Sequence, residues 1–234
     1  MDLVYVLLAL SGGVIPALFW LWFWLREDKK NPEPYRLIAL AFIGGMAVVP
    51  LALPLQKMAL DLYSGILLTT VWVTIEESLK YAAALALVLW NKAVDEPIDY
   101  VIYLIAIALG FSALENALFI FNPLVAGDIA DSLITGNFRF LGATLLHVLA
   151  SGTVGVFLAF AFYKRSSVKL MFGTIGLCIA IVLHGLFNFF IMDARGETIL
   201  TVFLFVWVGI IALFLIFEKL KHITLRHSAK RKRL

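Results

Sequence analysis

Long apolar stretches alternate with short polar connections along the chain. Seven of these stretches are close to or above the roughly 20 predominantly apolar residues that a helix needs to cross a bilayer. They lie at about residues 3–25, 35–56, 65–90, 98–121, 138–163, 168–191 and 198–217. The pattern predicts an all-α fold, a polytopic membrane helix bundle with about seven transmembrane helices. One transmembrane domain covers residues 1–217, and a basic tail covers residues 218–234.

The composition supports the membrane assignment. Apolar residues make up 62% of the chain and charged residues only 15%, against roughly 25% charged residues in a soluble domain. The single cysteine, Cys178, lies inside a predicted span, which excludes a framework of disulfides. The sequence is therefore that of an integral membrane protein.

The basic residues predict the orientation, because Lys and Arg are enriched in cytoplasmic loops. With the N-terminus outside, fifteen of the 19 Lys and Arg residues fall in the inner segments and three in the outer ones. We therefore predict an outside N-terminus and a cytoplasmic C-terminus. The basic residues stand next to span ends and in the terminal run HSAKRKRL. This placement is typical of a tail that attracts anionic lipid, and it argues against nucleic-acid binding.

The third predicted span, residues 65–90, contains three charged residues within five: Glu76, Glu77 and Lys80. Charges near the bilayer centre are costly, and they usually face the interior of a bundle or a wet cavity. Lys80 follows Glu76 by four residues and Glu77 by three, so the three side chains share one helix face. We predict that Lys80 is a charge partner that keeps the glutamates ionised.

The next three spans carry further polar residues at similar depth. These are Glu115 and Asn116, then His147, then His184 and Asn188. At about 1.5 Å of rise per residue, Glu76 lies roughly 16 Å below the outer end of its helix and His184 roughly 10 Å below its own. Both histidines stand on stripes of small residues, which let helices pack closely in lipid. We expect these residues to meet at one site in the outer half of the bilayer.

Hydrolysis of a peptide bond needs groups of this kind, because water must be deprotonated, the carbonyl polarised and the leaving amine protonated. A buried glutamate beside a second carboxylate suits the base, and Asn188 suits a donor to the oxyanion. The histidines suit either the binding of a metal or the positioning of water. Zn²⁺ accepts such ligands, but the chain has no H-E-x-x-H pair. The spacing therefore leaves a zinc mechanism and a metal-free mechanism open.

Four motifs follow one another along the chain: NPEP at 31–34, EESLK at 76–80, FSALEN at 111–116 and HGLFN at 184–188, with a histidine on the span between the last two. Their order resembles the PrsW-type intramembrane proteases, part of the wider superfamily of CAAX-processing and bacteriocin-processing membrane proteases. The resemblance implies cleavage of a single-pass membrane protein, typically an anti-sigma factor. It also implies that the cut is made on the extracytoplasmic side of a prokaryotic cell membrane.

The resemblance assigns roles position by position. Glu76 and Glu77 match the double-glutamate motif, Glu115 matches the acidic position of the second motif, and His184 with Asn188 matches the third. The CAAX-processing relatives have a histidine at the position of Glu115. This departure leaves open which groups bind water and whether another histidine takes that role.

We therefore predict a catalytic set in which Glu76 is the base and Asn188 the oxyanion donor. Its members are Glu76, Glu77, Glu115, His184 and Asn188, and the predicted ligands of a metal are Glu77, Glu115, His147 and His184. Two other classes stay open. A proton- or ion-coupled transporter also uses buried ionisable groups, although it commonly shows repeated halves, and a non-catalytic membrane scaffold is the third class.

Overall fold

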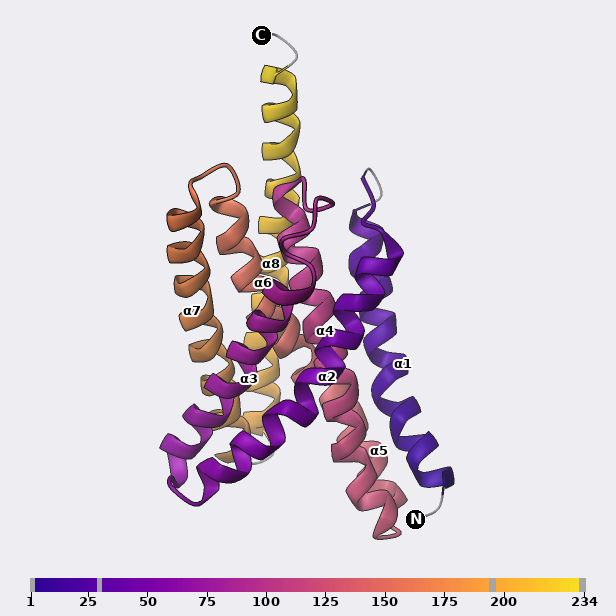
Figure 1. Cartoon of the computed structure of the whole chain (residues 1–234). Coiled ribbons are helices and arrows are strands. Elements are labelled where there is room, and N and C mark those ends of the chain that lie inside the picture. The colour runs from indigo at the N-terminus through magenta and orange to yellow at the C-terminus, as the bar shows by residue number, and fades with distance from the viewer. Residues whose placement is uncertain (1–2, 29–30, 194–196, 232–234) are drawn as a thin grey trace.

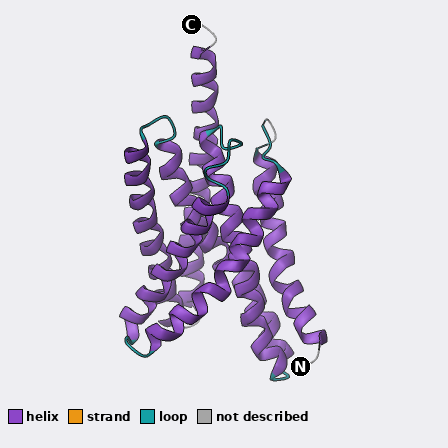
Figure 2. Cartoon of the chain, viewed as in Figure 1, coloured by secondary structure: helices purple, strands orange, loops and turns teal. Residues whose placement is uncertain are grey.

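The computed structural model describes residues 3–28, 31–193 and 197–231, without the side chains of 192–193, 197–198 and 222–231. All regular structure in these residues is helical (Figure 1, Figure 2). The elements in chain order are α1 (Leu3–Glu27), α2 (Tyr35–Leu60), α3 (Gly65–Leu87), α4 (Pro97–Val125), α5 (Ile129–Phe138), the π-helical turn η1 (Arg139–Ala143), α6 (Thr144–Phe160), α7 (Ser166–Asp193) and α8 (Glu197–Arg231). The predicted fold class is confirmed.

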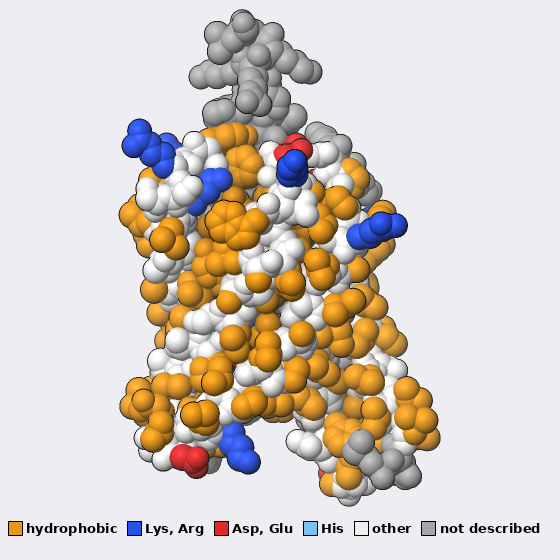
Figure 3. All heavy atoms as spheres, in the orientation of Figure 1, with side chains coloured by type: hydrophobic (Ala, Val, Ile, Leu, Met, Phe, Trp, Pro, Cys, Tyr) orange, Lys and Arg blue, Asp and Glu red, His pale blue; other side chains and the backbone are white. Residues whose placement is uncertain are grey.

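An apolar surface marks the bundle as a membrane protein. Among the described residues, six helical segments are long and apolar enough to cross a membrane: α1, α2, α4, the rod formed by α5, η1 and α6, α7, and α8 as far as Lys221. α3 has a comparable length of 23 residues, but its middle carries the three charged side chains noted above. On the face shown in Figure 3, apolar side chains form a broad band between charged groups at the two ends. α1 begins and α8 ends at opposite ends of the bundle (Figure 1). This arrangement requires an odd number of crossings, so α3 counts as the seventh beside the six apolar segments.

Several helix boundaries differ from the prediction. The span expected to begin at 138 begins at Ile129, because α5 continues through η1 into α6 as one rod of 32 residues. In η1 the N–H of Thr144 bonds to the carbonyl of Arg139, five residues back. α3 ends at Leu87 instead of residue 90, and α8 continues to Arg231, so the predicted basic tail extends the last helix as far as that residue.

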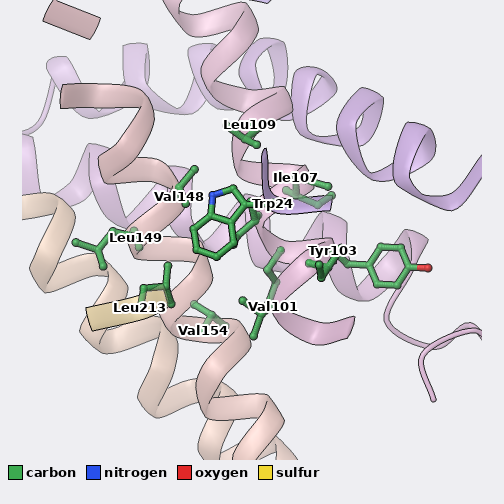
Figure 4. Packing of buried hydrophobic residues seen from close by; sticks show 14 of the residues in the cluster. Trp24, Val101, Tyr103, Ile107, Leu109, Val148, Leu149, Val154 and Leu213 are labelled. Atoms are coloured by element: carbon green, nitrogen blue, oxygen red, sulfur yellow. The ribbon is translucent and has the colours of Figure 1, made fainter. Parts of the chain in front are cut away.

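α4 occupies the centre of the bundle and packs against α1, α2 and α6. Its residues from Val101 to Leu109 are almost completely buried, because neighbouring helices surround this part of the helix. Figure 4 shows side chains of α4 packed with Trp24 of α1, Val148 of α6 and Leu213 of α8. The apolar core therefore holds α4 in a fixed position relative to α6.

Two glycines set the short distance between α2 and α4. A Cβ atom on Gly110 would lie 1.8 Å from the carbonyl oxygen of Phe42, and one on Gly45 would lie 1.9 Å from that of Ile107. Only glycine permits this approach, which is the usual reason for small residues between membrane helices. The close contact brings α2 beside the polar part of α3.

The small-residue stripes of α6 and α7 face the interior. Ala143, Ser151 and Ala180 are buried, as are His147 and His184 on the same two helices. α6 packs against both α4 and α7. The two histidines are therefore directed into the bundle and away from the lipid.

Candidate active site

Polar side chains of α3, α4, α6 and α7 meet inside the bundle. Glu76, Glu77, Lys80, His147 and His184 are each more than nine-tenths buried. The three α3 residues fall near the middle of their helix, roughly 16 Å or more from its first residue. The expected meeting of groups from separate spans is therefore present in the fold.

Glu77 accepts hydrogen bonds from two neighbours. Its Oε1 receives one from Lys80 Nζ at 2.5 Å and one from His184 Nδ1 at 2.8 Å. Lys80 Nζ also lies 3.1 Å from Nδ1 of His147 and 4.4 Å from the centre of the Phe111 ring. A buried ion pair persists when such additional contacts compensate for the lost hydration. Lys80 thus sits where the charge partner was predicted, and it also contacts an imidazole that the sequence did not assign to it.

His147 connects this pair to Glu115 on α4. Because the Lys80 ammonium can only donate, His147 Nδ1 is the acceptor and Nε2 carries the hydrogen. Nε2 donates to Glu115 Oε2 at 3.0 Å, and the same oxygen accepts from Nη2 of Arg139, the first residue of η1. A continuous chain of contacts therefore runs from Glu77 through Lys80, His147 and Glu115 to Arg139.

Arg139 and Glu115 form the accessible edge of the site. Their side chains are 16% and 18% exposed, whereas those of Lys80 and Glu77 are each 1% exposed. An arginine–glutamate pair at this position neutralises the carboxylate while leaving part of it open. Arg139 and Glu115 are therefore the more exposed end of the chain of contacts that leads to Glu77.

Asn116 fixes the arginine from the other side. Its Oδ1 accepts from Arg139 Nε at 2.6 Å, while its amide donates to Ser112 Oγ at 3.1 Å and to Thr144 Oγ1 at 2.9 Å. Ser112 and Thr144 also bond to each other at 3.0 Å. These bonds between α4 and α6 hold the guanidinium in one orientation.

Glu76 has one carboxylate oxygen without a partner. Its Oε1 accepts from Gln56 Nε2 at 2.7 Å, and the backbone carbonyl of Gln56 accepts from the indole of Trp72 at 3.0 Å. Oε2 is buried and makes no hydrogen bond with the described part of the chain. It lies 3.8 Å from His184 Nε2, which presents a lone pair because His184 Nδ1–H donates to Glu77. Two buried acceptors thus face each other.

Such an arrangement suits a water molecule or a cation, since buried acceptors need a partner. One ligand atom each of Glu76, His147 and His184 lies within 4.8 Å of the other two. Two imidazoles and a carboxylate are a ligand set that Zn²⁺ accepts. Glu77 bonds to Nδ1 of His184 and leaves the Nε2 lone pair free, whereas the one lone pair of His147, on Nδ1, accepts from Lys80. The residues present therefore fit a zinc ion that takes the place of Lys80 at Nδ1 of His147.

The carboxylate in this ligand set differs from the prediction. The metal set predicted from the sequence contained Glu77 and Glu115, but both are paired with cationic side chains in the structure. Glu76, predicted as the base, is the carboxylate that lies with both histidines. The reason is rotational: adjacent residues on a helix point about 100° apart, so Glu77 lies on the Nδ1 side of His184 and Glu76 on its Nε2 side.

Three further residues differ from the predicted site: Asn188 was included in it, whereas Arg139 and Gln56 were not. Asn188 is half-buried one turn beyond His184 and makes no side-chain hydrogen bond with a described residue. Arg139, one of the three basic residues counted on the outer side, was left out of the predicted site, although its spacing of four and eight residues from Ala143 and His147 extends the same stripe. Gln56 gave a weaker signal, a single amide near the end of an apolar span.

Comparison with known proteins supports the resemblance found in the motifs. The chain matches, over residues 33–216, a family described as PrsW family intramembrane metalloprotease. It is similar to Protease PrsW of Oceanobacillus iheyensis, with 23% identity over 208 residues that are 88% of this chain and 93% of the relative. Protease PrsW of Clostridioides difficile is 28% identical over 189 residues, 77% of each chain. Protease PrsW of Bacillus subtilis is 24% identical over 184 residues, 77% of this chain and 81% of the relative.

No solved structure matches the chain. The matched segment contains every side chain of the buried cluster, from Gln56 to His184. These findings confirm the prediction of a protease over a transporter or a scaffold. The chain, an integral membrane protein with a buried cluster of glutamates and histidines, belongs to the PrsW family of intramembrane proteases.

Proposed function

We propose that this protease hydrolyses a peptide bond of a single-pass membrane protein of the anti-sigma-factor kind, at a site reached from the extracytoplasmic side. Glu76 activates the attacking water, and His184 and His147 hold that water or a zinc ion beside it. In this proposal the N-terminus lies outside the cell, and the basic end of α8 lies against anionic lipid of the cytoplasmic leaflet.

One observation carries the assignment of the base. Glu76 Oε2 and His184 Nε2 are buried acceptors 3.8 Å apart, and no described group donates to the carboxylate oxygen. A water that donates to Glu76 becomes a better nucleophile as the carboxylate takes its proton. Because Gln56 holds Oε1 at 2.7 Å, Oε2 remains directed at the same point.

The other groups of the cluster support this step. Lys80 compensates the charge of Glu77, so Glu77 stays an acceptor and holds the hydrogen of His184 on Nδ1. After attack, the proton held by Glu76 passes to the leaving amine. Zinc, if held by Glu76, His147 and His184, would occupy Oε2 of Glu76, so it would polarise the peptide carbonyl and ease loss of a proton from water in place of Glu76 acting as the base.

The proposal is tested with the purified protein in liposomes together with a single-pass anti-sigma factor. We expect two fragments whose masses place the cut in the outer half of the substrate's transmembrane segment or in its extracytoplasmic flank. A cut on the cytoplasmic flank would contradict the proposed side of access. An unprocessed anti-sigma factor, under conditions in which the protease cleaves a different membrane protein, would contradict the proposed substrate class.

Arg139 is expected to position Glu115, and through it His147. Arg139→Gln should lower kcat by about 10- to 100-fold, the usual effect of losing a group that orients a catalytic or metal-bound histidine. Arg139→Lys should recover only part of the activity, because lysine restores the charge without the two contacts that the guanidinium makes with Glu115 and Asn116.

The measurement is kcat and KM on the cleaved substrate. Lys57→Gln, at an exposed lysine of α2, is the matched control and should leave both constants unchanged. Equal kcat values for Arg139→Gln and Lys57→Gln would contradict the proposed role of Arg139 in positioning Glu115.

A membrane-embedded substrate also fits an apolar cavity that is lined in part by the two helices carrying the histidines. The cavity has a volume of about 690 Å³ and lies between α6, α7 and α8. Leu146 and Leu183, which precede the two histidines in the sequence, are part of its lining. Phe190 and Phe205 line it as well and are exposed, so it opens on the lipid-facing surface. We propose that the transmembrane segment of the substrate occupies it.

Filling this cavity should impair cleavage. Ala212 lines it and is exposed, so Ala212→Trp adds an indole there without removing a buried contact. We expect KM to rise several-fold, because the added ring competes with the substrate segment for the same space. Ala86→Trp, at an exposed alanine of α3 outside the cavity, is the control. Equal KM values for the two variants would indicate that lipid fills the cavity instead.

A further inference from the structure

A second group of buried acidic side chains lies far from the active site. Asp28 follows the end of α1, Glu33 lies in the connection to α2, and Asp99 is in the first turn of α4. They are 4%, 5% and 0% exposed. One carboxylate oxygen of each lies within 4.8 Å of the other two. The group is at the end of the bundle where α8 ends (Figure 1).

The hydrogen bonds of this group leave two oxygens without partners. Asp99 Oδ2 accepts the backbone N–H groups of Asp95 and Glu96 at 2.8 and 2.7 Å, and so caps α4. Glu33 accepts from the hydroxyl of Tyr103, which Figure 4 shows extending away from the apolar core. Asp99 Oδ1 and Asp28 Oδ2 are buried and have no partner in the described part of the chain.

The charge of the group is also uncompensated among the described residues. Lys221 bonds to Glu27 at 3.3 Å and to Glu218 at 2.6 Å, and no described Lys or Arg forms an ion pair with the three carboxylates. Burial, followed by repulsion from Glu33 and Glu96, raises the pKa of Asp28 to about 7. Three carboxylates packed so closely repel one another, and burial removes the water that would screen them.

We propose that Asp28, Glu33 and Asp99 bind one hard divalent cation of the Mg²⁺ or Ca²⁺ class. Carboxylate and hydroxyl oxygens without nitrogen or sulfur ligands select such ions. The unpartnered Asp28 Oδ2 and Asp99 Oδ1 are the free acceptors that a cation needs. The ion would join the end of α1, the α1–α2 connection and the start of α4. This site is independent of the proposed catalytic roles and uses none of their residues.

Mn²⁺ is a suitable probe, because its free form is counted by electron paramagnetic resonance. The count is made on the purified protein carrying His147→Ala and His184→Ala, so that a metal in the active site does not contribute. We expect one bound Mn²⁺ per chain in this background. Adding Asp28→Asn or Glu33→Gln should remove it, and adding Asp61→Asn, at an exposed aspartate of the opposite end, should not.

Thermal stability gives a second readout that separates a cation from protons. With Mg²⁺ or Ca²⁺ in about 100-fold excess over Kd, the Tm of the unmodified protein should rise by roughly 5 °C or more over its value in a chelator. Asp28→Asn should abolish this rise. In the chelator, Asp28→Asn should be at least as stable as the unmodified protein, because it removes one of three repelling charges.

Two results would overturn the proposal. One is an Mn²⁺ count that is the same with Asp28→Asn and with Asp61→Asn. The other is a Tm of the unmodified protein that is the same with the cation and with the chelator, together with a higher Tm for Asp28→Asn in both buffers. Protons, and no cation, would then neutralise the group. Loss of cleavage activity in the histidine variants has no bearing on either result.

Discussion

Glu76→Gln is expected to lower the rate of substrate cleavage by about 10²- to 10⁴-fold and to leave the folded protein in the membrane. Glutamine has nearly the same shape and can keep the bond to Gln56, so packing against α2 is retained. It cannot take a proton from water, however. The loss should therefore appear in kcat, with KM little changed.

The assay follows fragment formation in liposomes, and Tm is measured on the same preparations. Glu27→Gln is the matched control, because Glu27 is a partly buried glutamate of a membrane helix that pairs with Lys221 at 3.3 Å, away from the active site. Cleavage by Glu76→Gln at the rate of this control would refute the assignment of the base. A much lower Tm of Glu76→Gln than of the control would instead show that Glu76 is needed for folding. That result would contradict the assignment of Glu76 as the base.

His184→Ala is expected to lower cleavage by about 10²-fold or more, because it removes the nitrogen that faces Glu76 across 3.8 Å. We also expect a strong chelator to inactivate the unmodified protein and added Zn²⁺ to restore it, since two imidazoles and a carboxylate fit this ion. In His184→Ala and His147→Ala, zinc should restore little activity, because each variant removes one of three ligands.

Zinc content and cleavage are measured on the same samples before and after chelation. His222→Ala, at a histidine near the C-terminal end of α8, should behave like the unmodified protein. Full activity of a zinc-free preparation would contradict the metal and leave water activated by Glu76 alone. Full activity of zinc-free His184→Ala would contradict the role of the histidine as well.

Much of this site was predictable from charged residues that stand inside apolar spans. A charged side chain inside an apolar span has few stable environments, so Glu76, Glu77 and Lys80 indicated an interior polar site without any coordinates. The histidines were predictable for a related reason, since stripes of small residues mark faces that pack against other helices. Both arguments depend only on local composition and helix geometry.

Arg139 shows where local reasoning fails. Arg139 is the second residue of the predicted span 138–163, and it was counted only among the outer basic residues. In the fold, α5 extends the helix by about two and a half turns before residue 138, and Arg139 reaches Glu115. The pairing depends on how α4 and η1 pack against each other, which the sequence of neither helix indicates by itself.

The buried acidic group illustrates the same limit over a longer range. Asp28, Glu33 and Asp99 are separated by 5 and 66 positions in the sequence. The NPEP motif contains one of them and by itself predicts a turn before α2. Their meeting depends on α1, α2 and α4 packing side by side, which the glycine contact between α2 and α4 makes possible.

The sequence alone determined the number and approximate position of the spans, the helical class, the uneven distribution of basic residues and the family. These properties follow from hydrophobicity, helix periodicity and residue order, which act within one segment at a time. The tertiary structure decided which glutamate faces the histidines, that Lys80 contacts His147, and that Arg139 pairs with Glu115. Such pairings depend on how each helix is rotated about its own axis against its neighbours, and that rotation is set by side-chain packing between segments distant in the sequence.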